Sequence, residues 1–281
     1  MSTKPVALTI AGSDSGGGAG IQADIKAMEA NGVFATSALA AVTAQNTETV
    51  AEAHDLPPSL VAAQIDAVAE DMDVRAAKTG MLSAPGIIEA VADRVRAHSL
   101  WPFVVDPVMI SKTGFKLLKD EAIDTLLNEL LPLATLITPN LHEAAHLTGH
   151  DDLETVDDLR RAAEVLYERG PDAVLVKGGH LADAEESVDV LVDGAEERIF
   201  TAPRIDTPHT HGTGCTYASA IAANLAKGHA LDAAVDRAKR YVTGAIRHAL
   251  PLGHGRGPTN HFFHLDPEAA ITDAAEVDAS D

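Results

Sequence analysis

Cysteine, long apolar runs and positive charge are all scarce in this 281-residue chain. A single cysteine, Cys215, excludes an intrachain disulfide and fits a reducing compartment. The N-terminal residues contain no basic region followed by a long apolar stretch, so we expect no signal peptide and a cytoplasmic location. The two longest charge-free runs, 30–47 and 207–226, are rich in Gly, Thr, His, Asn or Gln and do not resemble membrane spans.

Basic residues are outnumbered two to one: 42 Asp and Glu against 21 Lys and Arg give a formal net charge of −21. Nucleic acids and anionic membranes bind positive patches, so we expect neither as a partner. The excess of aspartate over lysine resembles proteins of salt-rich cytoplasm, where a Debye length of ~3 Å at molar salt screens the repulsion. We therefore expect a halophilic protein. A phosphate ligand would need local backbone N–H groups, a few basic residues and metal ions.

Strand-like and helix-like segments alternate along the chain. The apolar run 6–11, for example, is followed by apolar residues at helical spacing within 21–28. Repeated units of this kind predict an α/β fold with a mostly parallel central sheet and helices on both faces. Asp193-Gly194 predicts a hairpin, and so a small antiparallel element. No linker divides the chain, so we expect one domain over 1–265, followed by an acidic, flexible tail over 266–281.

Polar clusters follow the apolar runs at six places: Gly12–Asp14, Gln45-Asn46, Gly80-Met81, Asp106-Pro107, Pro139-Asn140 and Lys177–Gly179. Ligands of parallel α/β sheets bind beyond the carboxyl ends of the strands. One polar cluster is explained by the polarity of loops in general. Six clusters on the same edge predict a site.

The first glycine-rich segment, 12–20, lies between a predicted strand and a predicted helix. Glycines let the backbone approach a ligand closely, and a helix N-terminus offers free N–H groups. The segment is neither a Walker A loop nor a G-x-G-x-x-G dinucleotide motif. Taken alone it is equally consistent with a flexible turn.

The second glycine-rich segment, 211–216, precedes an apolar helix. The amides from Gly212 through Thr213 and Gly214 to Cys215 are placed to form an anion hole for a transferred γ-phosphate. Because a helix N-terminus lowers the pKa of a thiol, we expect Cys215 to be partly thiolate and to act as a base. Two alternatives are a buried structural cysteine and a Cys–His hydrolase that uses Cys215 with His211.

Three charged residues at the predicted edge suit phosphoryl transfer. Mg²⁺ prefers one or two carboxylates together with waters and phosphates. Asp106 and Glu143 would supply the carboxylates. For Glu143, a helix cap is an equally good interpretation. Lys177, between a strand and two glycines, is placed to pair with nucleotide phosphates.

Together these segments resemble the hydroxymethylpyrimidine and phosphomethylpyrimidine kinases of thiamine biosynthesis, within the ribokinase superfamily. The matching strings are ALTIAGSDSGGGAGIQADI (7–25), AVTAQNT (41–47), KTGML (78–82), DPVM (106–109), LITPNLHEA (136–144), VKGGH (176–180) and THGTGCT (210–216). They run in family order over nearly the whole chain. The resemblance implies a ribokinase-like fold, ATP as co-substrate with Mg²⁺, a small-molecule pyrimidine acceptor and a homodimer.

The resemblance also implies a role for most of the candidate residues. The positions that match the pyrimidine site are Gly12, Asp24, Gln45, Met81, Val108 and Cys215. Gln45 offers a donor and an acceptor to an aminopyrimidine edge. Asp24, three residues after Ile21, is expected to face away from its helix core and to bind the substrate hydroxyl. Asp106 and Glu143 match the metal environment, Asn140 and Lys177 the nucleotide side, and Cys215 the place of the catalytic base.

The sequence departs from the family at two places. Asp14-Ser-Gly-Gly-Gly replaces the usual Asp-Pro-Ser-Gly-Gly, and His209 stands where Asn is common, which leaves one phosphate contact open. No role is implied for His180. The nearest alternative is a pyridoxal kinase of the same fold, and another is a non-catalytic pyrimidine or nucleotide sensor. Whether one phosphorylation or two are performed is also open.

Overall fold

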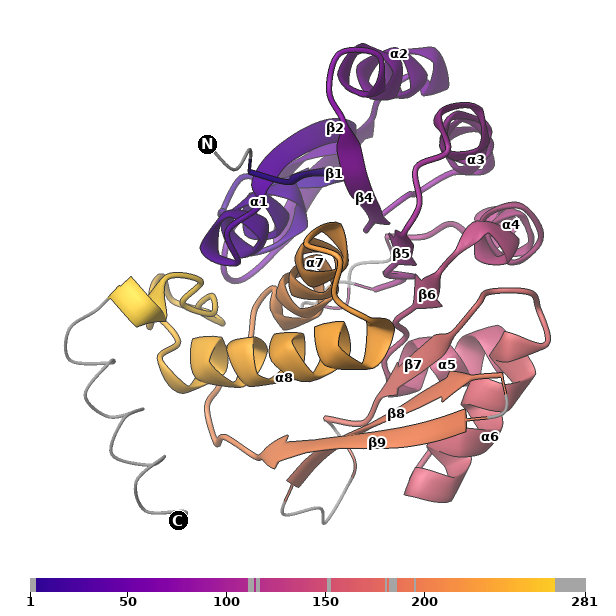
Figure 1. The fold of residues 1–281 in the computed structure, drawn as a ribbon. Coiled ribbons are helices and arrows are strands. Elements are labelled where there is room, and N and C mark those ends of the chain that lie inside the picture. Colours follow the sequence, from indigo (N-terminus) through magenta and orange to yellow (C-terminus); the bar gives the residue numbers. More distant parts are fainter. Residues whose placement is uncertain are drawn as a thin grey trace.

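The computed structural model describes residues 4–110, 114, 117–150, 153–179, 181, 186–194 and 196–265. The predicted tail over 266–281 and His180 lie outside these residues. A nine-stranded sheet runs through the described part (Figure 1). Its strands, in spatial order, are β3 (Val50–Asp55), β2 (Phe34–Gln45), β1 (Val6–Asp14), β4 (Val74–Thr79), β5 (Phe103–Val105), β6 (Leu136–Ile137), β7 (Val174–Lys177), β8 (Glu186–Asp193) and β9 (Glu196–Pro203).

The centre of the sheet is parallel, from β2 through β7. The edges are antiparallel, with β3 on β2 at one side and β8 and β9 beyond β7 at the other. Asp193 pairs with Glu196, so the predicted hairpin at Asp193-Gly194 is confirmed. The edge strand β3 is not predicted by the sequence, because its mostly exposed residues follow no apolar alternation.

Helices cover both faces of the sheet, as the alternating pattern predicts (Figure 1). One face carries α1 (Gly20–Ala30), α7 (Thr213–Ala226) and α8 (Leu231–Arg247). The other carries α2 (Pro58–Ala69), α3 (Pro85–His98), α4 (Asp120–Thr125), α5 (Leu141–Thr148) and α6 (Val156–Tyr167). Single turns of other helix types span Leu126–Leu130, Leu131–Leu133 and Phe263–Leu265.

Each face of the sheet has its own apolar core. Successive residues of a strand point alternately into one core and into the other. In β5, Val104 packs under α7, whereas Phe103 and Val105 pack on the opposite side. In β6, Leu136 and Ile137 divide in the same way. This two-residue period explains why the central strands read as continuous apolar runs.

Helix α7 is buried along almost its whole length, from Thr216 to Ala226. It packs against α1, α8 and the strands β4 and β5, and its many alanines permit this close approach. Its N-terminus is thereby held at the carboxyl edge of the sheet. In the sheet, β2 lies on one side of β1 and β4 lies on the other, so the chain connections leave β1 in opposite directions. Sheets of this kind open a ligand-binding crevice at such a point.

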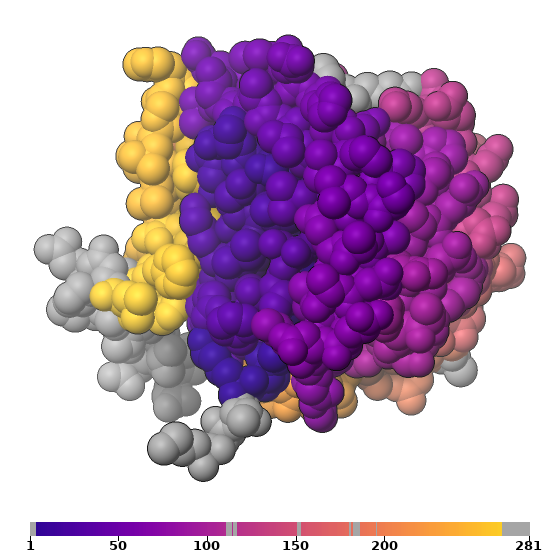
Figure 2. Space-filling model, turned by 90° about the horizontal axis from the view of Figure 1, so that it is seen from above, coloured from indigo at the N-terminus to yellow at the C-terminus, as the bar shows by residue number. Residues whose placement is uncertain are grey.

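The segment after α8 returns to the N-terminal third of the chain, as Figure 2 shows for its yellow and indigo atoms. The amides of Gly255 and Arg256 donate to the hydroxyl and carbonyl oxygens of Thr47, at 3.1 and 3.0 Å. Pro258 forms a β-bridge with His211, directly before α7. The last described residues therefore support the start of α7.

Across the described ranges, no helix combines the length and apolar character that a membrane crossing requires.

Candidate active site

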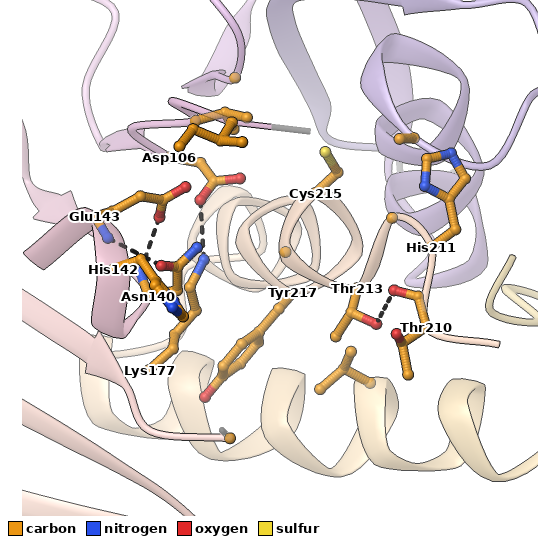
Figure 3. A pocket seen from close by; sticks show the side chains of 18 of the residues that line it. Asp106, Asn140, His142, Glu143, Lys177, Thr210, His211, Thr213, Cys215 and Tyr217 are labelled. Carbon is orange, nitrogen blue, oxygen red and sulfur yellow. Dashed lines mark hydrogen bonds and ion pairs between the residues drawn. The ribbon is translucent and has the colours of Figure 1, made fainter. Parts of the chain in front are cut away.

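A cavity of about 1270 Å³ opens at the carboxyl edge of the sheet. Each of the six polar clusters predicted from the sequence contributes at least one residue to its wall. Figure 3 shows Asp106, Asn140, Glu143 and Lys177 on one side of this cavity, and Cys215 and His211 on the other. The pattern of polar residues after apolar runs thus located the cavity correctly.

The turn before α7 presents unused amides to this cavity. Gly212 caps the helix in a left-handed conformation, φ 77°, without a side-chain hydrogen bond. Thr213 N–H donates to the carbonyl of Thr210 at 3.3 Å. Within the described part of the chain, the N–H groups of Gly214 and Cys215 donate to no acceptor. With the helix dipole behind them, these two amides form a site for an anion.

The Cys215 thiol lies on the cavity wall. Burial raises the pKa of Cys215 to about 12, and the negative charges of Asp24 and Asp106 act in the same direction, against the positive charge of Lys78. The expectation of a partial thiolate is therefore wrong for the free protein. Loss of hydration outweighs the favourable position at a helix N-terminus.

A protonated Cys215 predicts slow alkylation at neutral pH. We expect the rate of labelling by iodoacetamide to rise about tenfold per pH unit from pH 7 to 10 without a plateau, because only the thiolate reacts. Cys215 is the only cysteine, so mass spectrometry of the intact chain follows the reaction directly. A plateau below about pH 8 would contradict the raised pKa.

The geometry also bears on the alternative of a Cys–His hydrolase. His211 does have a carboxylate partner, since its Nε2 lies 2.8 Å from Asp14 Oδ2. However, no hydrogen bond joins His211 to Cys215 among the described residues. A thiol with a pKa of about 12 is a poor nucleophile at neutral pH. The hydrolase interpretation loses its chemical basis.

Opposite the turn, Lys177 and Asp106 form a buried ion pair of 3.0 Å. Thr138 Oγ1 donates to the same Asp106 oxygen at 3.2 Å, and Asp106 Oδ2 has no hydrogen-bond partner among the described residues. A Cβ added to Gly214 would lie 3.5 Å from Lys177 Nζ and 3.7 Å from Asp106 Oδ2. The pair therefore lies directly across from the free amides.

Glu143 has a structural role in addition to any chemical one. Its carboxylate accepts from the amide of Asn140 at 2.8 Å, and Asn140 Oδ1 accepts from the amide of Glu143 at 3.0 Å. This reciprocal capping box starts α5. Burial, with the nearby charge of Asp106, raises the pKa of Glu143 to about 7, although Lys177 acts in the opposite direction. The capping interpretation is confirmed, and the carboxylate still faces the cavity.

The cavity wall includes Gly12, Gln45, Met81 and Val108, the positions that the resemblance assigns to the pyrimidine. A Cβ on Gly12 would stand 2.4 Å from the terminal methyl of Met81, so only glycine lets this side chain lie across the strand end. Gln45 Nε2 lies 3.5 Å from His211 Nε2. Gln45 and the segment just before α7 are thus neighbours.

Asp24 does not face the cavity, and the expectation that it does is wrong. Its side chain is fully buried and accepts from Lys78 at 2.8 Å, Ser219 at 2.7 Å and Thr9 at 2.6 Å. These partners come from β4, α7 and β1, which surround α1. Because α7 covers this side of α1, Asp24 pairs with the buried Lys78 instead of facing the cavity. Asp24 therefore links α1 to β1, β4 and α7 behind the cavity wall.

Two charged residues on the cavity wall were missed by the sequence analysis. Lys239 on α8 and Asp189 on β8 are both nearly buried and form an ion pair of 2.7 Å. Lys239 also donates to Ser187 at 3.0 Å, and Asp189 accepts from the amide of Gly178 at 3.1 Å. The only signal was the aspartate within the apolar run of β8, which requires a partner when buried.

Three comparisons with known proteins agree on the class. The family model described as phosphomethylpyrimidine kinase matches residues 14–260. Hydroxymethylpyrimidine/phosphomethylpyrimidine kinase of Streptomyces coelicolor is 53% identical over 264 residues, which cover 94% of this chain and 96% of the relative. The crystal structure of an ADP complex of Bacillus subtilis pyridoxal kinase superposes with a TM-score of 0.88 at 40% identity, covering 94% of this chain and 100% of that one. Phosphomethylpyrimidine kinase from Clostridium difficile gives 0.77 at 44% identity, covering 86% and 100%.

The fold is therefore ribokinase-like, and the protein is a phosphotransferase of that fold. Within this class the chain belongs to the phosphomethylpyrimidine kinase family. Both predictions made from the sequence motifs are confirmed.

Proposed function

We propose that this chain transfers the γ-phosphoryl group of ATP to 4-amino-5-hydroxymethyl-2-methylpyrimidine, to its monophosphate, or to both, in thiamine diphosphate biosynthesis. One observation carries the proposal: the free amides of Gly214 and Cys215 face the Lys177–Asp106 pair across a cavity whose neighbouring wall holds Gln45. Phosphoryl transfer needs this arrangement of anion site, cation and acceptor site.

Binding and alignment do most of the work in this mechanism. The nucleotide phosphates bind Lys177, which is held by Asp106, and the side-chain amide nitrogen of Asn140. Gln45 pairs with the aminopyrimidine edge, while Met81 and Val108 cover the faces of the ring. Alignment of two bound reactants contributes on the order of 7–11 kcal/mol.

The turn before α7 stabilises the charge that develops during transfer. The amides of Gly214 and Cys215 point at the migrating group and need no reorganisation, because no internal acceptor competes for them. We propose that the Cys215 side chain touches the reacting hydroxyl group. As a base it would contribute about 10²–10⁴-fold, less than alignment and charge stabilisation together.

The residues present also fit a magnesium ion, which would neutralise phosphate charge when bound. Asp106 Oδ2 is buried and has no hydrogen-bond partner in the described part of the chain, as expected of an oxygen reserved for a cation. We propose Asp106 and Glu143 as the carboxylates that hold Mg²⁺ with the phosphates and waters. No group of three or more His, Cys, Asp or Glu suited to a metal occurs in the described ranges.

The proposed function is tested by ATP consumption with three acceptors: hydroxymethylpyrimidine, its monophosphate and pyridoxal. We expect kcat/KM for one of the pyrimidines to exceed that for pyridoxal by at least about tenfold, since Gln45 matches an aminopyrimidine edge. The likeness to a pyridoxal kinase structure makes pyridoxal the second candidate. A preference for pyridoxal would replace the proposed function, and nucleotide binding without turnover would indicate a sensor.

Two further proposals concern the salt dependence and the oligomeric state of the protein. The net charge of −21 supports a halophilic enzyme, whose activity and melting temperature rise as KCl increases from about 0.1 to 2 M. The family membership supports a homodimer. Sedimentation velocity in the same buffers measures the oligomeric state, and a monomer at high salt would contradict that proposal.

A further inference from the structure

The carboxylate of Asp14, at the end of β1, is almost fully buried and holds the first glycine-rich segment in place. Oδ1 accepts from the amide of Gly16 at 2.8 Å, and Oδ2 accepts from those of Gly18 at 3.1 Å and Ala19 at 2.8 Å. His211 Nε2 supplies a further contact at 2.8 Å. Burial alone would raise the pKa of Asp14, but these hydrogen bonds and His211 hold it below the usual value. The group is therefore a carboxylate at neutral pH.

This carboxylate determines which nitrogen of His211 carries a proton. An ionised carboxylate only accepts hydrogen bonds, so His211 donates to Asp14 from Nε2. Gln45 Nε2 is also a donor and lies 3.5 Å from the same nitrogen, so the two do not bond to each other. The amide N–H groups of Gln45 consequently remain free for a ligand.

The two glycine-rich segments also meet sterically. A Cβ on Gly212 would stand 1.7 Å from the carbonyl oxygen of Gly18, and a Cβ on Gly18 would stand 2.5 Å from His211 Cδ2. The backbone of His211 is fixed from the other side, because its amide donates to Gly257 at 3.1 Å and its carbonyl accepts from Thr259 at 3.3 Å. Two glycines and one ion pair thus interlock the segments.

These contacts connect two halves of the active site that lie far apart in the sequence. Gly12, Asp14 and Gly20 line the cavity from the first segment, and Gly212 to Cys215 line it from the second. In the proposed function the first segment borders the acceptor and the second borders the migrating phosphoryl group. Asp14 and His211, 197 positions apart, form the side-chain link between them. Neither residue needs to touch the reacting atoms to affect the distance between the reactants.

We propose that Asp14 and His211 form a positioning pair that sets the distance between the acceptor and the phosphoryl-binding turn. The proposal rests on the proposed function for its kinetic readout but not for its structural one. Loss of the link leaves both binding sites present and misaligns them. A misplacement of about 1 Å costs on the order of 10²-fold in rate.

The kinetic test compares His211→Phe with His211→Gln. Phenylalanine keeps the ring volume but cannot donate, whereas the amide of glutamine restores a donor to Asp14. We expect H211F to lower kcat about 100-fold while the Kd values of ADP and of the pyrimidine change less than about threefold. H211Q should recover most of the activity. His229→Phe, beyond the opposite end of α7, is the matched control and should be neutral.

A second readout uses the single cysteine and needs no substrate. Cys215 lies on the turn that His211 positions, and this turn packs against the first glycine-rich segment through Gly212 and Gly18. When the link is lost, Cys215 should be alkylated at least about fivefold faster by iodoacetamide at pH 9, well below the melting temperature, because local opening exposes it. H211Q and H229F should label at the rate of the unchanged protein.

Asp14→Asn and the D14N/H211F double variant complete the test. If the residues act as one unit, the double variant is no slower than the slower single variant. Additive losses, equal activities of H211F and H211Q, or a loss carried entirely by the Kd of one substrate would each overturn the proposal. If the unchanged protein shows no pyrimidine-dependent turnover, the proposed function fails, and the labelling rates still decide on the positioning pair.

Discussion

Gly212→Ala is expected to lower kcat by at least about 10³-fold, the largest effect of any single substitution considered for the turn. The new Cβ would stand 1.7 Å from the carbonyl oxygen of Gly18 and 3.3 Å from the Cα of Ala19. Both are backbone atoms in a segment held by Asp14, so neither can move aside cheaply. The turn must shift, and the free amides of Gly214 and Cys215 move with it. Steady-state kinetics with saturating ATP and pyrimidine measure the loss.

Gly228→Ala is a matched control, because Gly228 follows the other end of α7 and also has a positive φ, 84°. No atom lies within 4 Å of the Cβ that alanine would add there. Only the left-handed conformation is penalised, at about 1–2 kcal/mol of stability, and kcat should be unchanged. Equal losses of kcat in the two variants would show that strain, not displacement of the turn, is responsible.

The loss of kcat in Cys215→Ser is the reference with which the loss in Gly212→Ala is compared. Because Cys215 is protonated in the free protein, its replacement by another weak acid should leave measurable activity, with kcat lowered no more than about 100-fold. A Cys215→Ser variant less active than Gly212→Ala would contradict the weight given to alignment over base catalysis.

Lys78→Met is expected to lower the free energy of unfolding by about 3–5 kcal/mol. Lys78 is fully buried, and its ion pair with Asp24 raises its pKa despite the cost of burial. Methionine would leave the Asp24 carboxylate in the interior with only the Thr9 and Ser219 hydroxyl groups as partners. Urea unfolding at constant KCl, followed by circular dichroism, measures the change.

Lys4→Met is the matched control, because it also removes a lysine that pairs with a carboxylate of α1. Lys4 pairs with Glu29 of α1 at 2.6 Å, but these side chains are 50% and 33% exposed. Its loss should therefore cost less than about 1 kcal/mol. The variant D24N/K78M, which removes both buried charges, should recover part of the stability lost in K78M. Similar losses for Lys4 and Lys78 would show that burial does not control the strength of these pairs.

Local pattern predicted the general plan of the molecule and the edge at which its site lies. The alternation of apolar runs with helical spacing led to the two-faced parallel sheet, and the polar clusters after those runs led to the cavity. Asp106, Gln45, Lys177 and Gly214 needed no tertiary information, because a residue that ends a parallel strand or begins the following helix must lie at the carboxyl edge.

Residues whose environment depends on strand order were predicted less well. Asp24 follows the helical spacing of α1, but its partner Lys78 is adjacent only because β4 lies beside β1. The raised pKa of Cys215 depends on burial by distant segments, which outweighs the local effect of the helix N-terminus. The link from Asp14 to His211 joins opposite ends of the chain. Local pattern carries none of this information.

Residues 255–261, which support the turn before α7 and are here called the brace, have a consequence for protein synthesis. Thr216 bonds to His261, 45 positions later, at 3.0 Å, and His211 is bridged to Pro258. On a ribosome, the sheet and the cavity walls are translated well before this brace exists. A chain terminated at residue 250 would therefore lack every contact that residues 255–261 make to the turn before α7 and to Thr47. In the order of translation, the support of this turn is the last part of the cavity to be made.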